Sequence, residues 1–209
     1  MSEMLQLRAW LVDSGPEVYR TLVLDPRLTL NQLHTALQIA FGWENYHLHQ
    51  FHDNGGTRYG VPHESDPDVN DERKFCLGEV FNRKQKRIVY EYDFGDSWIH
   101  AVEFEKTVLS ESIEYPFETF IKEGKGLFSG KKRAAMCING ALAGPPEDCG
   151  GIHGYFNMLK LKKNPKAAKS RDAKERLKWL GDWEPSRFDL SDVNQRLGRI
   201  RVKKAMAGK

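Results

Sequence analysis

The sequence contains no run of about 18 apolar residues, the length that a transmembrane helix requires. Its start, MSEMLQLRAW, lacks the basic residues and apolar core of a signal peptide. Its three cysteines, Cys76, Cys137 and Cys149, form no closely spaced pair, which argues against a disulfide framework. We therefore expect a cytoplasmic protein with free thiols and no membrane partner.

The chain also lacks a strong net charge, because its formal charge is only +3 over 209 residues. Charge is nevertheless unevenly distributed. Residues 64–72 are acidic, whereas residues 83–87, 131–133, 160–178 and 199–209 are rich in lysine and arginine. Basic runs of this kind can contact phosphates, although most are solvated helix faces.

Tryptophans near the basic residues can stack on the bases of single-stranded nucleic acid, and the alternative is that they pack in the core. The basic run at 160–178 supplies candidate phosphate contacts. The candidate nucleic-acid contacts are therefore Trp98, Lys162, Lys163, Lys166 and Lys169. Trp179 and Leu177 are predicted to pack inside the protein as part of a helix at 167–180.

Known catalytic signatures are absent, because the chain has no G-x-S-x-G and no H-E-x-x-H motif. The loop GPPEDCGG at 144–151 lacks the Gly-Lys-Ser/Thr ending of a phosphate-binding P-loop. It nevertheless offers Glu147 and Asp148 beside backbone amides. The alternative is a tight structural turn that joins helix to sheet.

The order of the predicted strands and helices, which are segregated along the chain, predicts an α+β protein with a mainly antiparallel sheet. Residues 5–12 and 18–24 read as a hairpin, and residues 29–41 as a helix with a capping box of Thr29 and Gln32. A Gly/Pro loop and C-terminal helices follow, after a stretch at 110–136 that reads as a linker with a short helix. We expect a single domain over 1–209, with a hairpin, helix and sheet core in 1–109 and the loop and basic helices in 110–209.

Residues 86–104 predict a second hairpin, with Gly95-Asp96 as a two-residue loop. This register opposes Asp93 to Trp98 and Glu91 to His100. Because side chains alternate between the two faces of a strand, this register places those four side chains on one polar face. The opposite, core face carries Tyr90 and Tyr92.

Carboxylates beside a histidine on this face can perform acid–base chemistry or bind a divalent metal, and the alternative is a cross-strand charge pair. The candidate catalytic residues are Asp93, His100, Glu147 and Asp148. In HLHQFH, two histidines one residue apart can reach one ion from a strand, or they are ordinary polar residues. The candidate metal ligands are His47, His49, Asp93, Asp96 and His100. Cys137 and Cys149 lie too far apart for a typical zinc motif.

Three strings, FGWENYHLHQF, YEYDFGDSWIHAVEFEK and PPEDCGGIHGYFNML, occur in this order between residues 5 and 197. With them the chain resembles the plasmid pRiA4b ORF-3-like proteins, which also occur as passengers of insertion elements. The resemblance implies one α+β domain and no assigned activity. Many relatives have Cys-Pro-Pro-Glu-Asp in the loop, whereas Gly144 precedes Pro145 here, so no cysteine ligand is implied at that position.

Three functions remain open. The first is a binding module, for nucleic acid, associated with a mobile element. The second is a metal-assisted hydrolase that uses a His/Asp cluster with a divalent metal as its cofactor. This hypothesis brings together the histidines and carboxylates named above: His47, His49, Asp93, Asp96 and His100, with Glu147 and Asp148 as further candidates. The third is a protein-interaction domain without chemistry.

Overall fold

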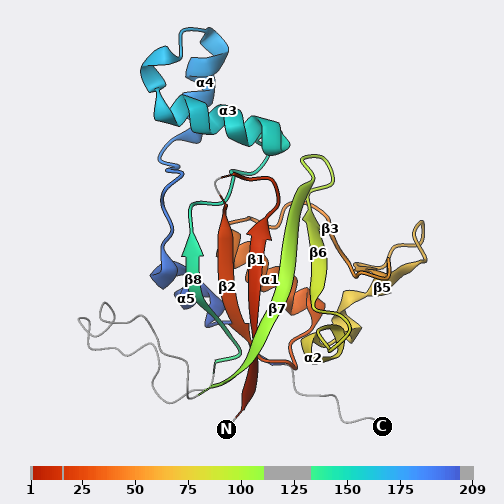
Figure 1. Cartoon of the computed structure of the whole chain (residues 1–209). Helices are drawn as coiled ribbons and strands as arrows, with labels where there is room; N and C mark the ends of the chain where they lie inside the picture. Colours follow the sequence, from red (N-terminus) through yellow and green to blue (C-terminus); the bar gives the residue numbers. More distant parts are fainter. Residues whose placement is uncertain (1, 16, 111–132, 203–209) are drawn as a thin grey trace.

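The computed structural model describes residues 2–15, 17–110 and 133–202. One eight-stranded sheet forms its centre, in the order β5-β4-β3-β6-β7-β1-β2-β8 (Figure 1). Neighbouring strands are antiparallel except β4 and β5. The strands are β1 (Glu3–Leu11), β2 (Tyr19–Leu24), β3 (His49–His52), β4 (Arg58–Gly60), β5 (Val69–Asp71), β6 (Arg87–Tyr92), β7 (Trp98–Leu109) and β8 (Ala135–Ala141). The α+β prediction is confirmed.

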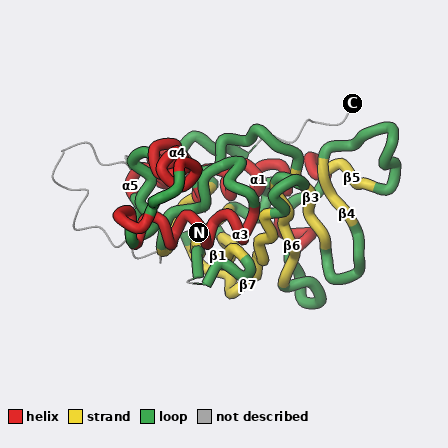
Figure 2. The backbone as a smooth tube through the Cα atoms, turned by 90° about the horizontal axis from the view of Figure 1, so that it is seen from above, coloured by secondary structure: helices red, strands yellow, loops and turns green. Residues whose placement is uncertain are grey.

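The α-helices are α1 (Leu30–Phe41), α2 (Leu77–Val80), α3 (Gly151–Lys163), α4 (Arg171–Leu180) and α5 (Leu190–Leu197). Seen from above, α1 and α5 lie on the same side of the sheet (Figure 2). Helices α3 and α4 form an arm beyond one end of the strands (Figure 1). Within the described residues, no helix is long and apolar enough to cross a membrane.

Helix α1 forms as its capping signals predict. The backbone N–H of Thr29 donates to Gln32 Oε1 at 3.1 Å, which closes one arm of the capping box. Leu28 and Leu33 are fully buried beside it. The helix ends at Gly42, whose φ of 85° is a left-handed conformation that glycine adopts without strain. The end of α1 thereby directs the chain toward His47.

The hairpin of β6 and β7 differs from the predicted register by one residue. Tyr92 pairs with Trp98, and Tyr90 with His100, so the loop has five residues, 93–97. Asp93 causes the difference, because its side chain accepts from the Gly95 N–H at 2.9 Å and its φ is 58°. A shift of one residue exchanges the two faces of a strand. Trp98 and His100 therefore lie in the core with Tyr90 and Tyr92, not on a polar face.

Strand β8 was not predicted. It begins at the end of the stretch interpreted as a linker with a short helix and continues into the start of the stretch interpreted as a Gly/Pro loop; residues 111–132 of the former lie outside the described part. It extends the sheet beside β2, and α5 packs against it. Asn194 of α5 bonds to both backbone groups of Cys137, accepting from its N–H at 2.9 Å and donating to its carbonyl at 2.8 Å. This side chain satisfies backbone groups on the open edge of β8, the last strand of the sheet.

Candidate metal centre

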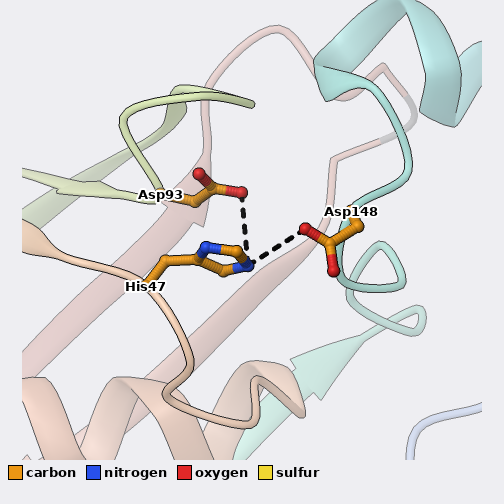
Figure 3. A group of neighbouring side chains, drawn as sticks. All are labelled: His47, Asp93 and Asp148. Atoms are coloured by element: carbon orange, nitrogen blue, oxygen red, sulfur yellow. Dashed lines mark ion pairs between the residues drawn. The ribbon is translucent and has the colours of Figure 1, made fainter.

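Three loops meet where the strands face the helical arm, and each brings one candidate ligand (Figure 3). His47 lies between α1 and β3, Asp93 between β6 and β7, and Asp148 between β8 and α3. His47 Nε2 is 3.2 Å from Asp148 Oδ1 and 3.7 Å from Asp93 Oδ2. One ligand atom from each of the three lies within 4.8 Å of the others, and no second such group of three occurs in the described part of the chain.

A third carboxylate, that of Glu147, approaches the same nitrogen. Its Oε2 is 3.8 Å from His47 Nε2. Its other oxygen accepts from the Glu44 N–H at 2.7 Å and from the Tyr92 hydroxyl at 2.9 Å. Burial and the Glu147 carboxylate raise the pKa of Tyr92, so the hydroxyl remains protonated and donates. These bonds orient Glu147 and leave Oε2 facing the imidazole.

The atoms that face one another lack hydrogen bonds. His47 Nε2 and Glu147 Oε2 are both buried atoms that make no hydrogen bond within the described structure. Burying such groups unpaired is costly, and so is holding three carboxylates around one point. A divalent cation would remove both costs. One imidazole nitrogen with carboxylate oxygens is a donor set that suits Mn²⁺, Zn²⁺ and related ions.

Asp93 is the most enclosed of these ligands, with a side chain only 8% exposed. Its backbone N–H donates to the Leu48 carbonyl at 2.9 Å, and this bond joins the loop of Asp93 to the segment of His47. Asp148 lies at the opposite extreme, with 69% of its side chain exposed. The cluster is therefore buried at Asp93 and open to solvent at Asp148, where a further ligand can enter.

The Gly/Pro loop is held tightly against α1, as its structural interpretation predicts. The Trp183 indole N–H donates to the Gly144 carbonyl at 2.9 Å. A Cβ at Gly144 would lie 2.1 Å from the Phe41 carbonyl oxygen, so only glycine fits there. Asp96 fixes the far end of the loop by accepting from the Gly150 N–H at 3.0 Å.

Replacing Gly144 by Ala is expected to displace this loop. The variant should lose about 2 kcal/mol of unfolding free energy, because the Cβ overlaps a backbone oxygen, and it should misplace Glu147. Urea unfolding and a Mn²⁺ titration measure the two effects. Gly15→Ala is the matched control, since nothing lies within 4 Å of a Cβ there, and its stability should change by no more than about 1 kcal/mol. Unchanged stability and metal affinity in Gly144→Ala would contradict this role of the loop.

The structure brings together His47, Asp93, Glu147 and Asp148 of the predicted catalytic and metal residues. It places the others elsewhere. His49 bonds to Glu72 at 2.8 Å and stacks on His34. His100 is fully buried, with Nδ1 3.0 Å from the Trp98 carbonyl oxygen.

Asp96 fixes the Gly/Pro loop instead of joining the cluster. The pairing of His47 with His49 assumed one strand through both, but β3 begins only at His49. Cys137 and Cys149 are free and buried, and burial raises the pKa of their thiols to about 11 and about 12.

The predicted nucleic-acid contacts are one buried tryptophan and four lysines of the helical arm. Trp98 is 1% exposed, so it cannot present its ring to a base. Lys162 donates to the Gly181 carbonyl at 2.8 Å and so joins α3 to the end of α4. Lys163, Lys166 and Lys169 are exposed on the arm, away from the sheet (Figure 1).

Comparison with known proteins gives matches along most of the chain. The family model described as "Plasmid pRiA4b ORF-3-like protein" matches residues 3–126 and 120–192. The uncharacterized protein y4hQ of Sinorhizobium fredii is 29% identical over 207 residues, which are 97% of this chain and 95% of that protein. The crystal structure of MM3350 from Methanosarcina mazei Go1, a protein of unknown function, has a TM-score of 0.74 and 28% identity, and the match covers 93% of this chain and 99% of that one. The chain belongs to the plasmid pRiA4b ORF-3-like family.

Proposed function

We propose that this protein binds a divalent metal ion between His47, Asp93, Glu147 and Asp148 and acts as a metal-assisted hydrolase. The observation that carries the proposal is the unsatisfied contact at its centre. Three carboxylates approach one buried imidazole nitrogen, and neither this nitrogen nor the Glu147 oxygen facing it has a hydrogen bond. A bound cation satisfies all of these groups at once.

The surroundings support a catalytic role. A divalent ion held by these residues would polarise a carbonyl or phosphoryl oxygen and would lower the pKa of a bound water toward neutrality. Tyr92 positions a ligand by donating to Glu147, which is the usual task of a residue behind a metal ligand.

Calorimetric titration of the metal-free protein with Mn²⁺ and with Zn²⁺ tests the proposal. We expect one ion per chain, and at 100 times Kd the ion should raise the unfolding free energy by about 3 kcal/mol. His47→Gln and Asp93→Asn should each weaken binding at least about 100-fold, and Tyr92→Phe about tenfold. His52→Gln and Asp68→Asn, which change residues outside the cluster, are the matched controls. Equal binding by His47→Gln and the unchanged protein would contradict the proposed site.

A further inference from the structure

We propose, on the basis of this metal site, that the substrate is a nucleoside phosphate, held in a groove whose wall includes two of the metal ligands, Glu147 and Asp148. The groove has a volume of about 560 Å³, within the range of small-molecule sites. It runs between the end of α1, the Gly/Pro loop and the segment from α4 to α5. Glu147 and Asp148 both line it, so a ligand in the groove reaches the metal site.

Three arginines line the groove, and two of them, Arg187 and Arg196, have little or no pairing with a carboxylate. Arg187 is exposed, and its side chain has no hydrogen bond or ion pair within the described structure. Arg196 has one ion pair, to Asp192 at the long distance of 3.9 Å. Arg20 is buried and bonds only to backbone carbonyls, including Ala141 at 2.8 Å, with no carboxylate partner.

Five carboxylates also line the groove: four have a partner or face the proposed cation, and the fifth, that of Glu44, is exposed. Asp189 accepts from the Asp192 N–H at 3.0 Å and so caps α5. Glu147 and Asp148 face the proposed cation. Guanidinium groups recognise phosphate oxygens through paired hydrogen bonds, and divalent ions bind phosphates through oxygen. Arginines and a metal site that share one groove therefore match a phosphate group.

An exposed indole supplies the second element of recognition. Trp179 of α4 lines the groove and is 53% exposed, so the prediction that it packs in the core is wrong. Its neighbour Trp183 also lines the groove, anchored by its bond to Gly144. Bases stack on such rings because every base presents a π face. A phosphate-binding wall beside an open indole defines a nucleoside phosphate, present as a free nucleotide or within single-stranded nucleic acid.

Tryptophan fluorescence of the full chain tests the inference in two media, one with EDTA and one with Mn²⁺. The probes are AMP, adenosine and a single-stranded ten-nucleotide oligo(dA). We expect AMP to quench the fluorescence in both media, with tighter binding in Mn²⁺, and adenosine to bind at least tenfold more weakly than AMP. AMP binding with weak oligonucleotide binding identifies a free nucleotide. Tighter, strongly salt-dependent oligonucleotide binding identifies single-stranded nucleic acid. Adenosine binding as tight as AMP binding would overturn the inference.

Variants separate this inference from the metal site. Arg187→Gln and Trp179→Leu should each weaken AMP binding in EDTA about tenfold or more. Arg83→Gln and Trp10→Leu, which lie outside the groove, should not. His47→Gln should remove only the increment due to Mn²⁺. Mn²⁺ binding without AMP binding would contradict the nucleoside phosphate as substrate but not the metal site. AMP binding without Mn²⁺ binding would contradict the metal site but not the nucleoside phosphate site.

Discussion

Lowering the pH from 7.5 to 5 in the presence of a chelator is expected to reduce the free energy of unfolding by about 4 kcal/mol, measured by urea denaturation. Two buried histidines cause the loss. Burial, together with the stacked His49 ring, lowers the pKa of His34 to about 4. Burial, together with the nearby Arg20 charge, lowers the pKa of His100 to about 4.

The direction follows from where protons bind. In the unfolded chain both rings take up a proton near the ordinary pKa of 6.5, whereas in the folded protein they remain neutral down to about pH 4. Between these values the unfolded chain binds more protons, so stability falls as the pH falls. Each ring contributes about 2 kcal/mol at pH 5, and the loss is complete below pH 4.

Glu72 adds to the effect in more acidic solution. Burial alone would raise its pKa, but hydrogen bonds from His49 and Asn31 outweigh the burial and hold the pKa below its ordinary value. Its contribution to stability is therefore present above the unfolded pKa and is lost as the pH falls through the folded pKa.

His100→Leu isolates one of the two histidines. The leucine keeps an apolar contact with Phe41, whose ring centroid is 4.6 Å from that of His100, and it cannot titrate. We expect the loss between pH 7.5 and 5 to shrink by about 2 kcal/mol. His63→Gln, an exposed position, should leave the pH profile unchanged. A His100→Leu profile as steep as that of the unchanged protein would contradict the assignment.

Replacing Arg20 by Met is expected to cost about 3–5 kcal/mol of stability. Burial lowers the pKa of this guanidinium to about 10, so it remains charged near pH 7. It stands between the rings of Phe41 and Phe188, at 5.0 and 4.1 Å from their centroids. Its N–H groups donate to four backbone carbonyls, those of Tyr19, Ala40, Ala141 and Leu142, at 2.6–2.8 Å.

The methionine fills part of the volume but donates nothing, so the carbonyls that lose Arg20 remain buried and unpaired. These carbonyls belong to β2, the end of α1 and the end of β8, and Arg20 therefore ties the sheet edge to the helix. Urea unfolding at pH 7 measures the loss. Arg83→Met, at an exposed position, should change stability by less than about 0.5 kcal/mol. A loss below about 1 kcal/mol for Arg20→Met would show that water replaces the guanidinium.

Local signals in the sequence predict the elements that depend on neighbours in the chain. The capping box at Thr29 and Gly42 after Phe41 bound α1 within one residue of the structure. Strands β1 and β2 likewise follow from their β-forming residues and the turn between them. The β6–β7 register does not, because the Asp93 side chain lengthens the loop and a sequence pattern does not reveal that contact.

The candidate site was predicted in part from the sequence. The hydrolase hypothesis grouped His47 with Asp93, Glu147 and Asp148, which the structure brings together, but it also included residues that the structure places elsewhere. The structure unites the four residues of the cluster through three loops separated by about half of the chain, and such contacts leave no periodic signal. His49 and His100 were placed in the group because an alternating pattern continues through them, although their rings point into the core.

Pulsed electron paramagnetic resonance of Mn²⁺ bound to the protein tests the metal site most directly, because coupling to ¹⁴N reports each histidine ligand. The account predicts one bound Mn²⁺ per chain with coupling to a single histidine nitrogen. The coupling should vanish in His47→Gln and persist in His52→Gln. A bound ion without nitrogen coupling, or coupling that survives in His47→Gln, would contradict the site, as would the absence of stoichiometric Mn²⁺ binding.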